Sequence, residues 1–211
     1  MDLAIETTPN LWRSATMGAI AAAVARLPKG GASFWRLSVL LGPGAVPLLL
    51  IILSLPHMLP IVIPGTGIAS AVPMVCLAAG LLRGRQRLEL PAWVGRRRLE
   101  FWYCDKLLSA LDRLLGWVER FSPPRFDHLL GKGMRVGIAG AILLMVILIV
   151  LPLPAGNPPA AAAVVAFAVG LLRRDGLLIL VGHAIGVIAV AWNVAIAALI
   201  YIAGVEIWSI L

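Results

Sequence analysis

Hydrophobic residues in this chain fall into three long blocks separated by short polar stretches. The first block runs from Leu37 to Leu82, the second from Val136 to Leu172, and the third from Leu177 to Leu211. Prolines and glycines interrupt the first two blocks, between Pro56 and Gly67 and between Pro152 and Pro159. Because such clusters end regular helices, the sequence predicts two helical hairpins with irregular tips, followed by a long helix.

The lengths of the expected helices decide whether each of them can span a membrane. Ala45 to Leu55 would form a helix only about 16 Å long at 1.5 Å per residue. Arms this short barely cross a hydrocarbon core about 30 Å thick, so each tip is expected either to be re-entrant or to reach the far interface. The third block would be about 52 Å long as one helix, so it is expected to tilt, kink or end early.

Composition sets the class of protein. Of the 211 residues, 61% are hydrophobic and 13% are charged, whereas a soluble domain is about 45–50% apolar and about 25% charged. This excludes an ordinary soluble domain and a disordered chain, and two cysteines exclude a disulfide scaffold. We expect an all-α integral membrane protein with two repeated hairpins, interfacial amphipathic helices and a C-terminal transmembrane helix.

Basic residues give the expected orientation. Twelve of the eighteen lie between residues 83 and 135, and there Leu99 to Phe121 has apolar positions at helical spacing. This stretch is interpreted as an amphipathic helix in the membrane interface, with a solvated helix packed on the protein as the alternative, and a weaker helix is expected from about Asn10 to Leu27. The positive-inside rule places the N-terminus and residues 83–135 in the cytoplasm.

The net charge of +8 is attributed to contact with lipid head groups, and no nucleic-acid partner is expected. The acidic N-terminus lacks the pattern of a signal peptide.

The two hairpins look like an internal repeat. The tetrapeptide Gly80-Leu81-Leu82-Arg83 recurs 90 residues later as Gly170-Leu171-Leu172-Arg173, and the same shift superposes Pro64 on Pro154 and Trp12 on Trp102. We therefore predict one membrane domain over residues 1–211, with repeat units at roughly 11–87 and 101–177 and a C-terminal helix at 178–211. A parallel relation is favoured by the charges, and an inverted relation would require a basic segment outside.

This pattern resembles the ExoD family of bacterial exopolysaccharide-synthesis proteins. The segments that carry the resemblance are Leu55-Pro56-His57-Met58-Leu59-Pro60, Pro91-Ala92-Trp93-Val94, Leu151-Pro152-Leu153-Pro154-Ala155-Gly156-Asn157 and Gly170-Leu171-Leu172-Arg173-Arg174-Asp175-Gly176. Family members commonly carry Asn in place of His57. The resemblance implies a multi-pass protein of the bacterial inner membrane that is linked to exopolysaccharide production, and it implies no particular reaction.

Polar residues at membrane depth are the candidates for function. The two tips are expected to pack together, and there His57, Thr66 and Asn157 would form a substrate or ion site. In the alternative reading, His57 only hydrogen-bonds backbone carbonyls that the broken helix leaves free, and Asn157 only forms a turn. His183 and Asn193 are predicted to line one broad polar face of the last helix, either as part of a site or as polar contacts between helices.

Other residues are assigned to packing and to lipid. Gly182 and Gly186 allow close helix approach, and a homodimer through this helix is predicted. Arg96-Arg97-Arg98 is expected to bind lipid head groups, with a phosphorylated lipid carrier as the alternative.

Three functions remain open at this point. Signatures of catalytic, metal and phosphate-binding sites are missing, so no cofactor or metal is expected. The chain is interpreted as a transporter-like protein, as an accessory subunit that assembles with polysaccharide-synthesis proteins, or as an enzyme on a lipid-linked intermediate.

Overall fold

The computed structural model describes residues 32–35, 44–58, 66–83, 92–96, 98–99 and 132–210. The elements in chain order are β1 (Ala32–Ser33), α4 (Ala45–Ser54), η2 (Leu55–Met58), α5 (Thr66–Leu82), α6 (Ala92–Gly95), β2 (Arg98–Leu99), α8 (Lys132–Val150), α9 (Asn157–Arg173) and α10 (Gly176–Ile210). The helix expected from Asn10 to Leu27 lies outside the described residues.

Both predicted hairpins contain the expected helical arms. In the first, α4 continues into the 3₁₀ turn η2, and α5 begins at Thr66. In the second, α8 ends at Val150 and α9 begins at Asn157 after a short turn. Pro158 and Pro159 lie in the first turn of α9, where proline is tolerated because those backbone amides have no partner within the helix.

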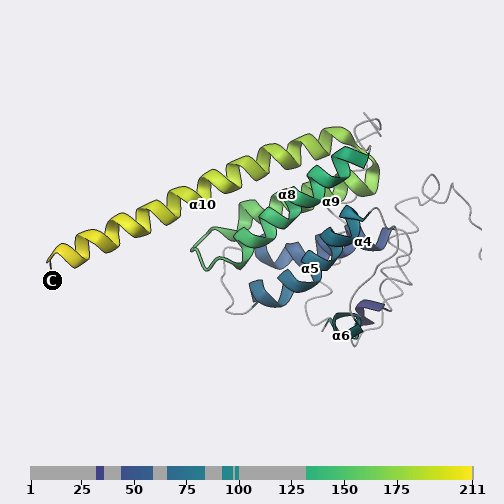
Figure 1. Cartoon of the computed structure of the whole chain (residues 1–211), viewed down its shortest axis with the longest axis horizontal. Helices are drawn as coiled ribbons and strands as arrows, with labels where there is room; N and C mark the ends of the chain where they lie inside the picture. The colour runs from purple at the N-terminus through teal and green to yellow at the C-terminus, as the bar shows by residue number, and fades with distance from the viewer. Residues whose placement is uncertain are drawn as a thin grey trace, which may run out of the picture.

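Helix α9 lies at the centre of the packing (Figure 1). It contacts α4, α8 and η2, and its most extensive contacts are with α10, while α5 packs mainly against α8. In a repeat of the two hairpins, α4 corresponds to α8 and α5 corresponds to α9. The contact between α4 and α9 is therefore matched by the contact between α8 and α5. This is the contact pattern that a pseudo-twofold repeat requires, and the repeat itself stays a prediction.

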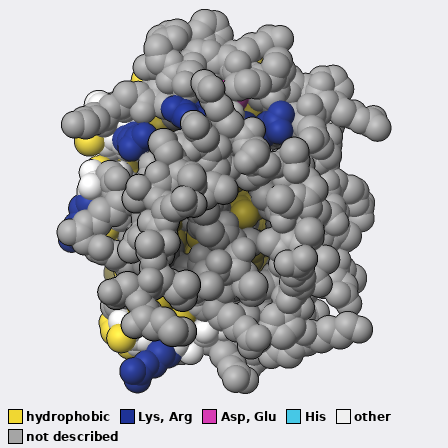
Figure 2. All heavy atoms as spheres, turned by 90° about the vertical axis from the view of Figure 1, so that its right-hand side faces the viewer, with side chains coloured by type: hydrophobic (Ala, Val, Ile, Leu, Met, Phe, Trp, Pro, Cys, Tyr) yellow, Lys and Arg dark blue, Asp and Glu magenta, His cyan; other side chains and the backbone are white. Residues whose placement is uncertain are grey.

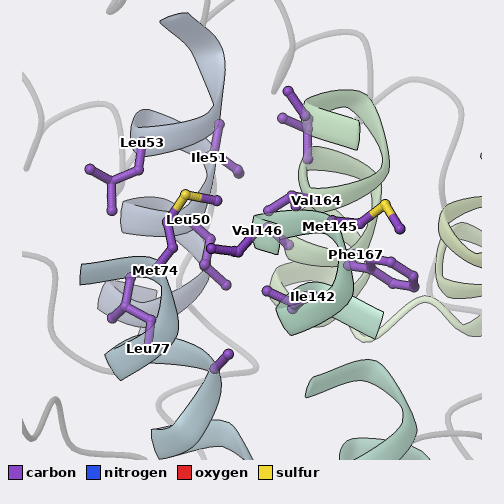
Figure 3. Packing of buried hydrophobic residues seen from close by; sticks show 14 of the residues in the cluster. Leu50, Ile51, Leu53, Met74, Leu77, Ile142, Met145, Val146, Val164 and Phe167 are labelled. Carbon is purple, nitrogen blue, oxygen red and sulfur yellow. The ribbon is translucent and has the colours of Figure 1, made fainter. Parts of the chain in front are cut away.

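The core is apolar and joins the two hairpins. Figure 3 shows side chains of α4 and α5, such as Leu50 and Met74, opposite Val146 and Phe167 of the second hairpin. Helix α4 is buried along nearly its whole length, and its Leu49 and Ile51 are fully covered. A helix of ten residues, about 15 Å long, is therefore surrounded by protein rather than by lipid.

Two helices are long and apolar enough to cross a membrane, judged by length and composition. The candidate spans are Gly133–Val150 in α8 and Gly176–Glu206 in α10, and only 17% of the α10 span is buried. Helix α10 does not end early, because it continues through 35 residues and extends beyond the bundle (Figure 1). Its outer half exposes large apolar side chains such as Leu199, Ile202 and Trp208, as expected where lipid replaces water.

One expectation about local structure is wrong. The sequence predicts that Leu99 begins an amphipathic helix, but Leu99 belongs to strand β2, where it pairs with Ala32 of β1 in an antiparallel ladder of two residues each. This ladder gives the backbone of Leu99 hydrogen-bonding partners on another segment, whereas a helix would take them from its own chain. It is also the one departure from helical structure among the described elements. The rest of that predicted helix lies outside the described residues.

The turn between α9 and α10 is held by a capping carboxylate. Arg174 has a left-handed backbone with φ of 55°, and the Asp175 N–H donates to the Gly170 carbonyl at 2.9 Å. The Asp175 side chain accepts a hydrogen bond from the Leu177 N–H at 2.9 Å, which satisfies a free amide of the first turn of α10. Asp175 is 1% exposed, so this acid is a buried helix cap and is not solvated.

Candidate functional site

The first hairpin tip contains a buried pair of polar side chains. His57 is 5% exposed, and its Nε2 lies 2.7 Å from Oγ of Ser70, which is on the first turns of α5. The Ser70 hydroxyl is also 3.1 Å from the Gly67 carbonyl. A hydroxyl has one proton, so when Ser70 donates to Gly67, His57 Nε2–H must donate to Ser70. The bond therefore joins η2 to α5 across the tip.

The second tip is held by two consecutive residues of α10. Trp192 Nε1–H donates to the Ala155 carbonyl at 3.0 Å, and Asn193 Nδ2–H donates to the Gly156 carbonyl at 3.1 Å. Ala155 has φ of 56°, a left-handed conformation that is unfavourable for a residue with a Cβ. These contacts from α10, 37 residues further along the chain, hold the strained turn in place.

The close approach of the Asn193 side chain explains why residue 156 is glycine. A Cβ on Gly156 would lie 2.5 Å from Asn193 Oδ1 and 3.1 Å from Leu153 Cβ. The backbone of Gly156 has φ of −77°, so its conformation is open to any residue and space is the constraint. The small residue thus allows Asn193 to reach the tip.

Two buried amide oxygens at the second tip have no hydrogen-bond partner among the described residues. They are Oδ1 of Asn157, the first residue of α9, and Oδ1 of Asn193. Both protons of Asn193 Nδ2 are used, one by Gly156 and one by the Ala189 carbonyl at 2.8 Å. Buried polar atoms in proteins are usually paired, so an orphan acceptor points to water, an ion or a donor group that approaches it.

The tips of the two hairpins adjoin each other through backbone. Helix η2 packs against α9, and a Cβ on Gly67 would lie 2.9 Å from the Ile149 carbonyl near the end of α8. The structure thus brings the start of α5 to the end of α8. Thr66 is the first residue of α5, and its side chain lies outside the description, as do residues 59–65.

His183 and Asn193 lie apart, each with its own surroundings. Asn193 contacts the second tip, whereas His183 lies ten residues earlier, about 15 Å along α10. His183 Nδ1 lies 2.9 Å from the Ile179 carbonyl, and its ring meets that of Phe167 edge-on with centroids 4.8 Å apart. The two residues therefore do not form one polar cluster.

Gly182 and Gly186 face helices of the same chain. A Cβ on Gly182 would lie 2.8 Å from the Phe167 ring, and one on Gly186 would lie 3.7 Å from Met145. Both glycines are buried, so they allow α10 to approach α9 and α8. A homodimer stays a prediction, and its interface would use other residues of α10.

Within the described ranges, no group of three His, Cys, Asp or Glu residues could hold a metal ion. Arg96 is exposed at the end of α6, Arg98 lies in β2, and Arg97 is outside the description. The prediction that these three arginines bind lipid head groups stays a prediction.

Comparison with known proteins identifies the family. Residues 18–195 match the family described as "Exopolysaccharide synthesis, ExoD". The chain belongs to the ExoD family. The chain is 29% identical over 171 residues to uncharacterized protein slr1875 of Synechocystis sp., with 78% of each chain covered.

Protein ExoD of Rhizobium meliloti is also similar. The identity is 29% over 161 residues, which cover 70% of this chain and 63% of the Rhizobium protein. No solved structure matches this ExoD-family chain. The family confirms the resemblance drawn from the tip motifs and links the protein to exopolysaccharide synthesis.

Sequence reasoning missed three residues of the tips. Ser70 is the hydrogen-bond partner of His57. Trp192 donates to the Ala155 carbonyl, and Gly156 leaves the space that Asn193 occupies. Their spacing of 13 and 37 residues from their partners has no periodic signal, so only the packing of the helices reveals them.

Proposed function

We propose that this ExoD-family protein acts in the bacterial inner membrane in exopolysaccharide synthesis or export, with a polar site for a small substrate or an ion at its two hairpin tips. The family description supports the link to exopolysaccharide. The two apolar spans support a place in the membrane. Broken helices that meet at such tips are typical of transporter sites.

One observation carries the transporter-like part of this proposal. The second tip holds two buried acceptor oxygens without partners, on Asn157 and Asn193, beside a strained turn. Leaving such groups unpaired costs about 1–3 kcal/mol each. A bound water, cation or hydroxyl would recover that free energy, so the tip favours a ligand that donates hydrogen bonds or carries positive charge.

An accessory role is the second candidate, and the exposed half of α10 favours it. His57 and Asn193 are nearly inaccessible, so the tips are closed in this conformation. A tip that never opens would be a structural junction. The exposed apolar half of α10 would then offer a surface for other membrane proteins of the polysaccharide machinery.

Cysteine accessibility separates the two candidates. In a background without Cys76 and Cys104, Asn157→Cys would be treated in native membranes with a small membrane-permeant thiol reagent. A transport site opens to water during its cycle, so Cys at 157 is expected to react. Ala163→Cys is the matched control, because Ala163 lies on the same helix and is 0% exposed. If the cysteines at positions 157 and 163 were equally unreactive toward the reagent, the accessory role would be favoured.

A further inference from the structure

The outer surface of the two hairpin tips is apolar, although polar atoms lie just beneath it. His57, Ser70 and Asn193 are buried, and their hydrogen bonds stay within the protein. A turn in water commonly presents Asn, Asp or Ser, but the Asn157 side-chain oxygen is buried. The large exposed side chains at the described parts of the tips are Met58, Ile68, Ile147, Val150 and Leu151. Hydrocarbon is a better solvent for such a surface than water is.

Charged residues lie at the opposite end of the helices. The chain contains no Lys, Arg, Asp or Glu between Arg36 and Arg83, or between Arg135 and Arg173. Arg135 lies in the first turn of α8, and Arg173 and Arg174 lie where α9 turns into α10. Figure 2 looks onto this basic end and shows several Lys and Arg side chains there. Each hairpin therefore runs from a basic end to an uncharged tip.

Helix α10 passes both tips and continues beyond them (Figure 1). Trp192 and Asn193 bond to the second tip, and the start of α5 at the first tip lies beside the end of α8, so both tips are level with this part of α10. The helix is about 24 Å long from Gly176 to Trp192 and about 20 Å long from Asn193 to Glu206. Glu206 is its first charged residue.

These lengths bear on the depth of the tips in a bilayer. The apolar span Gly176–Glu206 is about 45 Å long, whereas the hydrocarbon core is about 30 Å thick. If the tips lay at the boundary of the core, the exposed Leu199 and Ile202 would stand beyond it. A tilt of about 40°, the upper end of the usual range, shortens the span to about 34 Å and leaves the tips about 15 Å below the far boundary. Helix α8, the other candidate span, ends at the tips and would cover about 21 Å at that tilt.

We propose that both hairpins are re-entrant and that their apolar tip surface contacts the acyl chains of the far leaflet, which is the leaflet away from the basic end. Among the described helices, α10 alone crosses that leaflet. Irregular backbone at this depth must be hydrogen-bonded within the protein, as it is by Trp192 and Asn193 at the second tip. A polar ligand therefore reaches the tips between the helices or through lipid, and not directly from the water beyond the far leaflet.

Spin labels measure this depth. In a background without Cys76 and Cys104, the full chain would carry one nitroxide-labelled cysteine at a time and would be reconstituted in phosphatidylcholine vesicles. The labelled positions are all exposed, so a label displaces no core contact: Met58, Leu151, Ile188, Leu199 and Ser209. Electron paramagnetic resonance then compares collisions with oxygen, which concentrates in hydrocarbon, and with a water-soluble nickel chelate present on both sides of the membrane.

Ile188 is the reference for hydrocarbon and Ser209 the reference for water. At Met58, Leu151 and Leu199, nickel collisions should be as few as at Ile188 and several-fold fewer than at Ser209, while oxygen collisions stay frequent. Nickel access near the Ser209 level at either tip, or at Leu199, would overturn the proposal. Shielding of these labels from both reagents would also overturn it, because protein such as a second copy would then cover the surface.

Lysine at a tip gives a second measurement. Leu151→Lys places a charge in hydrocarbon, which is costly, so the amount of folded chain in membranes should fall several-fold. Leu151→Ala is the matched control, since it removes the same exposed side chain without adding charge, and it should fold normally. A Leu151→Lys chain that folds as well as Leu151→Ala would contradict the proposal. Loss of the tip site in His57→Ala, Asn157→Ala should leave the label depths unchanged, so this depth is tested separately from the proposed function.

Discussion

The contact between Gly156 and Asn193 makes a quantitative prediction about how the second tip is held. In Gly156→Ala, the new Cβ would lie 2.5 Å from Asn193 Oδ1, and the Asn193 side chain is held by two hydrogen bonds. Asn193 is 2% exposed, so it has little room to move. Forcing extra volume into such a packed site destabilises a protein by about 1–3 kcal/mol.

The backbone conformation at residue 156 has the opposite effect on stability. Because φ at Gly156 is −77°, alanine is compatible there and should by itself stabilise the fold by about 0.4–1 kcal/mol. We therefore expect a net loss of about 1–2 kcal/mol for Gly156→Ala in the wild-type chain. In an Asn193→Ala background the closest obstruction is gone and only the 3.1 Å approach to Leu153 Cβ remains, so the same substitution should be close to neutral.

A double-mutant cycle measures this coupling. Equilibrium unfolding in mixed micelles, followed by Trp fluorescence, would give the free energy of each variant. Gly140→Ala is the matched control, since a Cβ there meets nothing within 4 Å, and it should not be destabilising. A coupling energy of about 2 kcal/mol is expected for residues in direct contact. Additive effects of Gly156→Ala and Asn193→Ala would refute the reasoning.

Three further predictions concern the cap, the topology and the oligomer. Asp175→Ala should destabilise the chain by about 1–2 kcal/mol in the same unfolding assay, and Asp175→Asn should cost less because it keeps the capping acceptor. In a background without Cys76 and Cys104, a membrane-impermeant thiol reagent added to intact cells should not label Cys in place of the exposed Ala92, although it should reach Cys at 155 if that tip extends to the outside; labelling at 92 would overturn the orientation. Light scattering of the purified chain should give a dimer, and a monomer in several detergents and in nanodiscs would contradict this.

The helices were predictable because clusters of proline and glycine mark their ends, whereas the isolated Pro73 lies within α5. The arms of both hairpins begin and end within a few residues of the positions expected from Pro56, Gly67 and Pro152. This follows from local chemistry, since a proline in a helix interior removes a hydrogen bond and clashes with the preceding turn. The long last helix was predictable from its unbroken apolar pattern.

The contacts of the site were less predictable, because they depend on how the helices pack. The sequence singled out His57, Asn157 and Asn193 as polar groups in apolar surroundings, but it contained no signal that His57 meets Ser70 or that Asn193 reaches Gly156. The glycine pair of α10 has the spacing of a dimer motif, yet the same spacing serves packing within one chain. Leu99 forms a strand because a distant segment supplies its partner.

The central claim is that the hairpin tips act in polysaccharide production and not only in folding. The most direct measurement is the amount of polysaccharide formed per molecule of folded protein, for the double variant His57→Ala, Asn157→Ala in cells without the native copy. The control Met58→Ala, Leu151→Ala changes exposed residues at the same two tips. We expect the first variant to lose polysaccharide at normal levels of folded protein, while the control retains it. Wild-type polysaccharide from a well-folded His57→Ala, Asn157→Ala chain would contradict the claim.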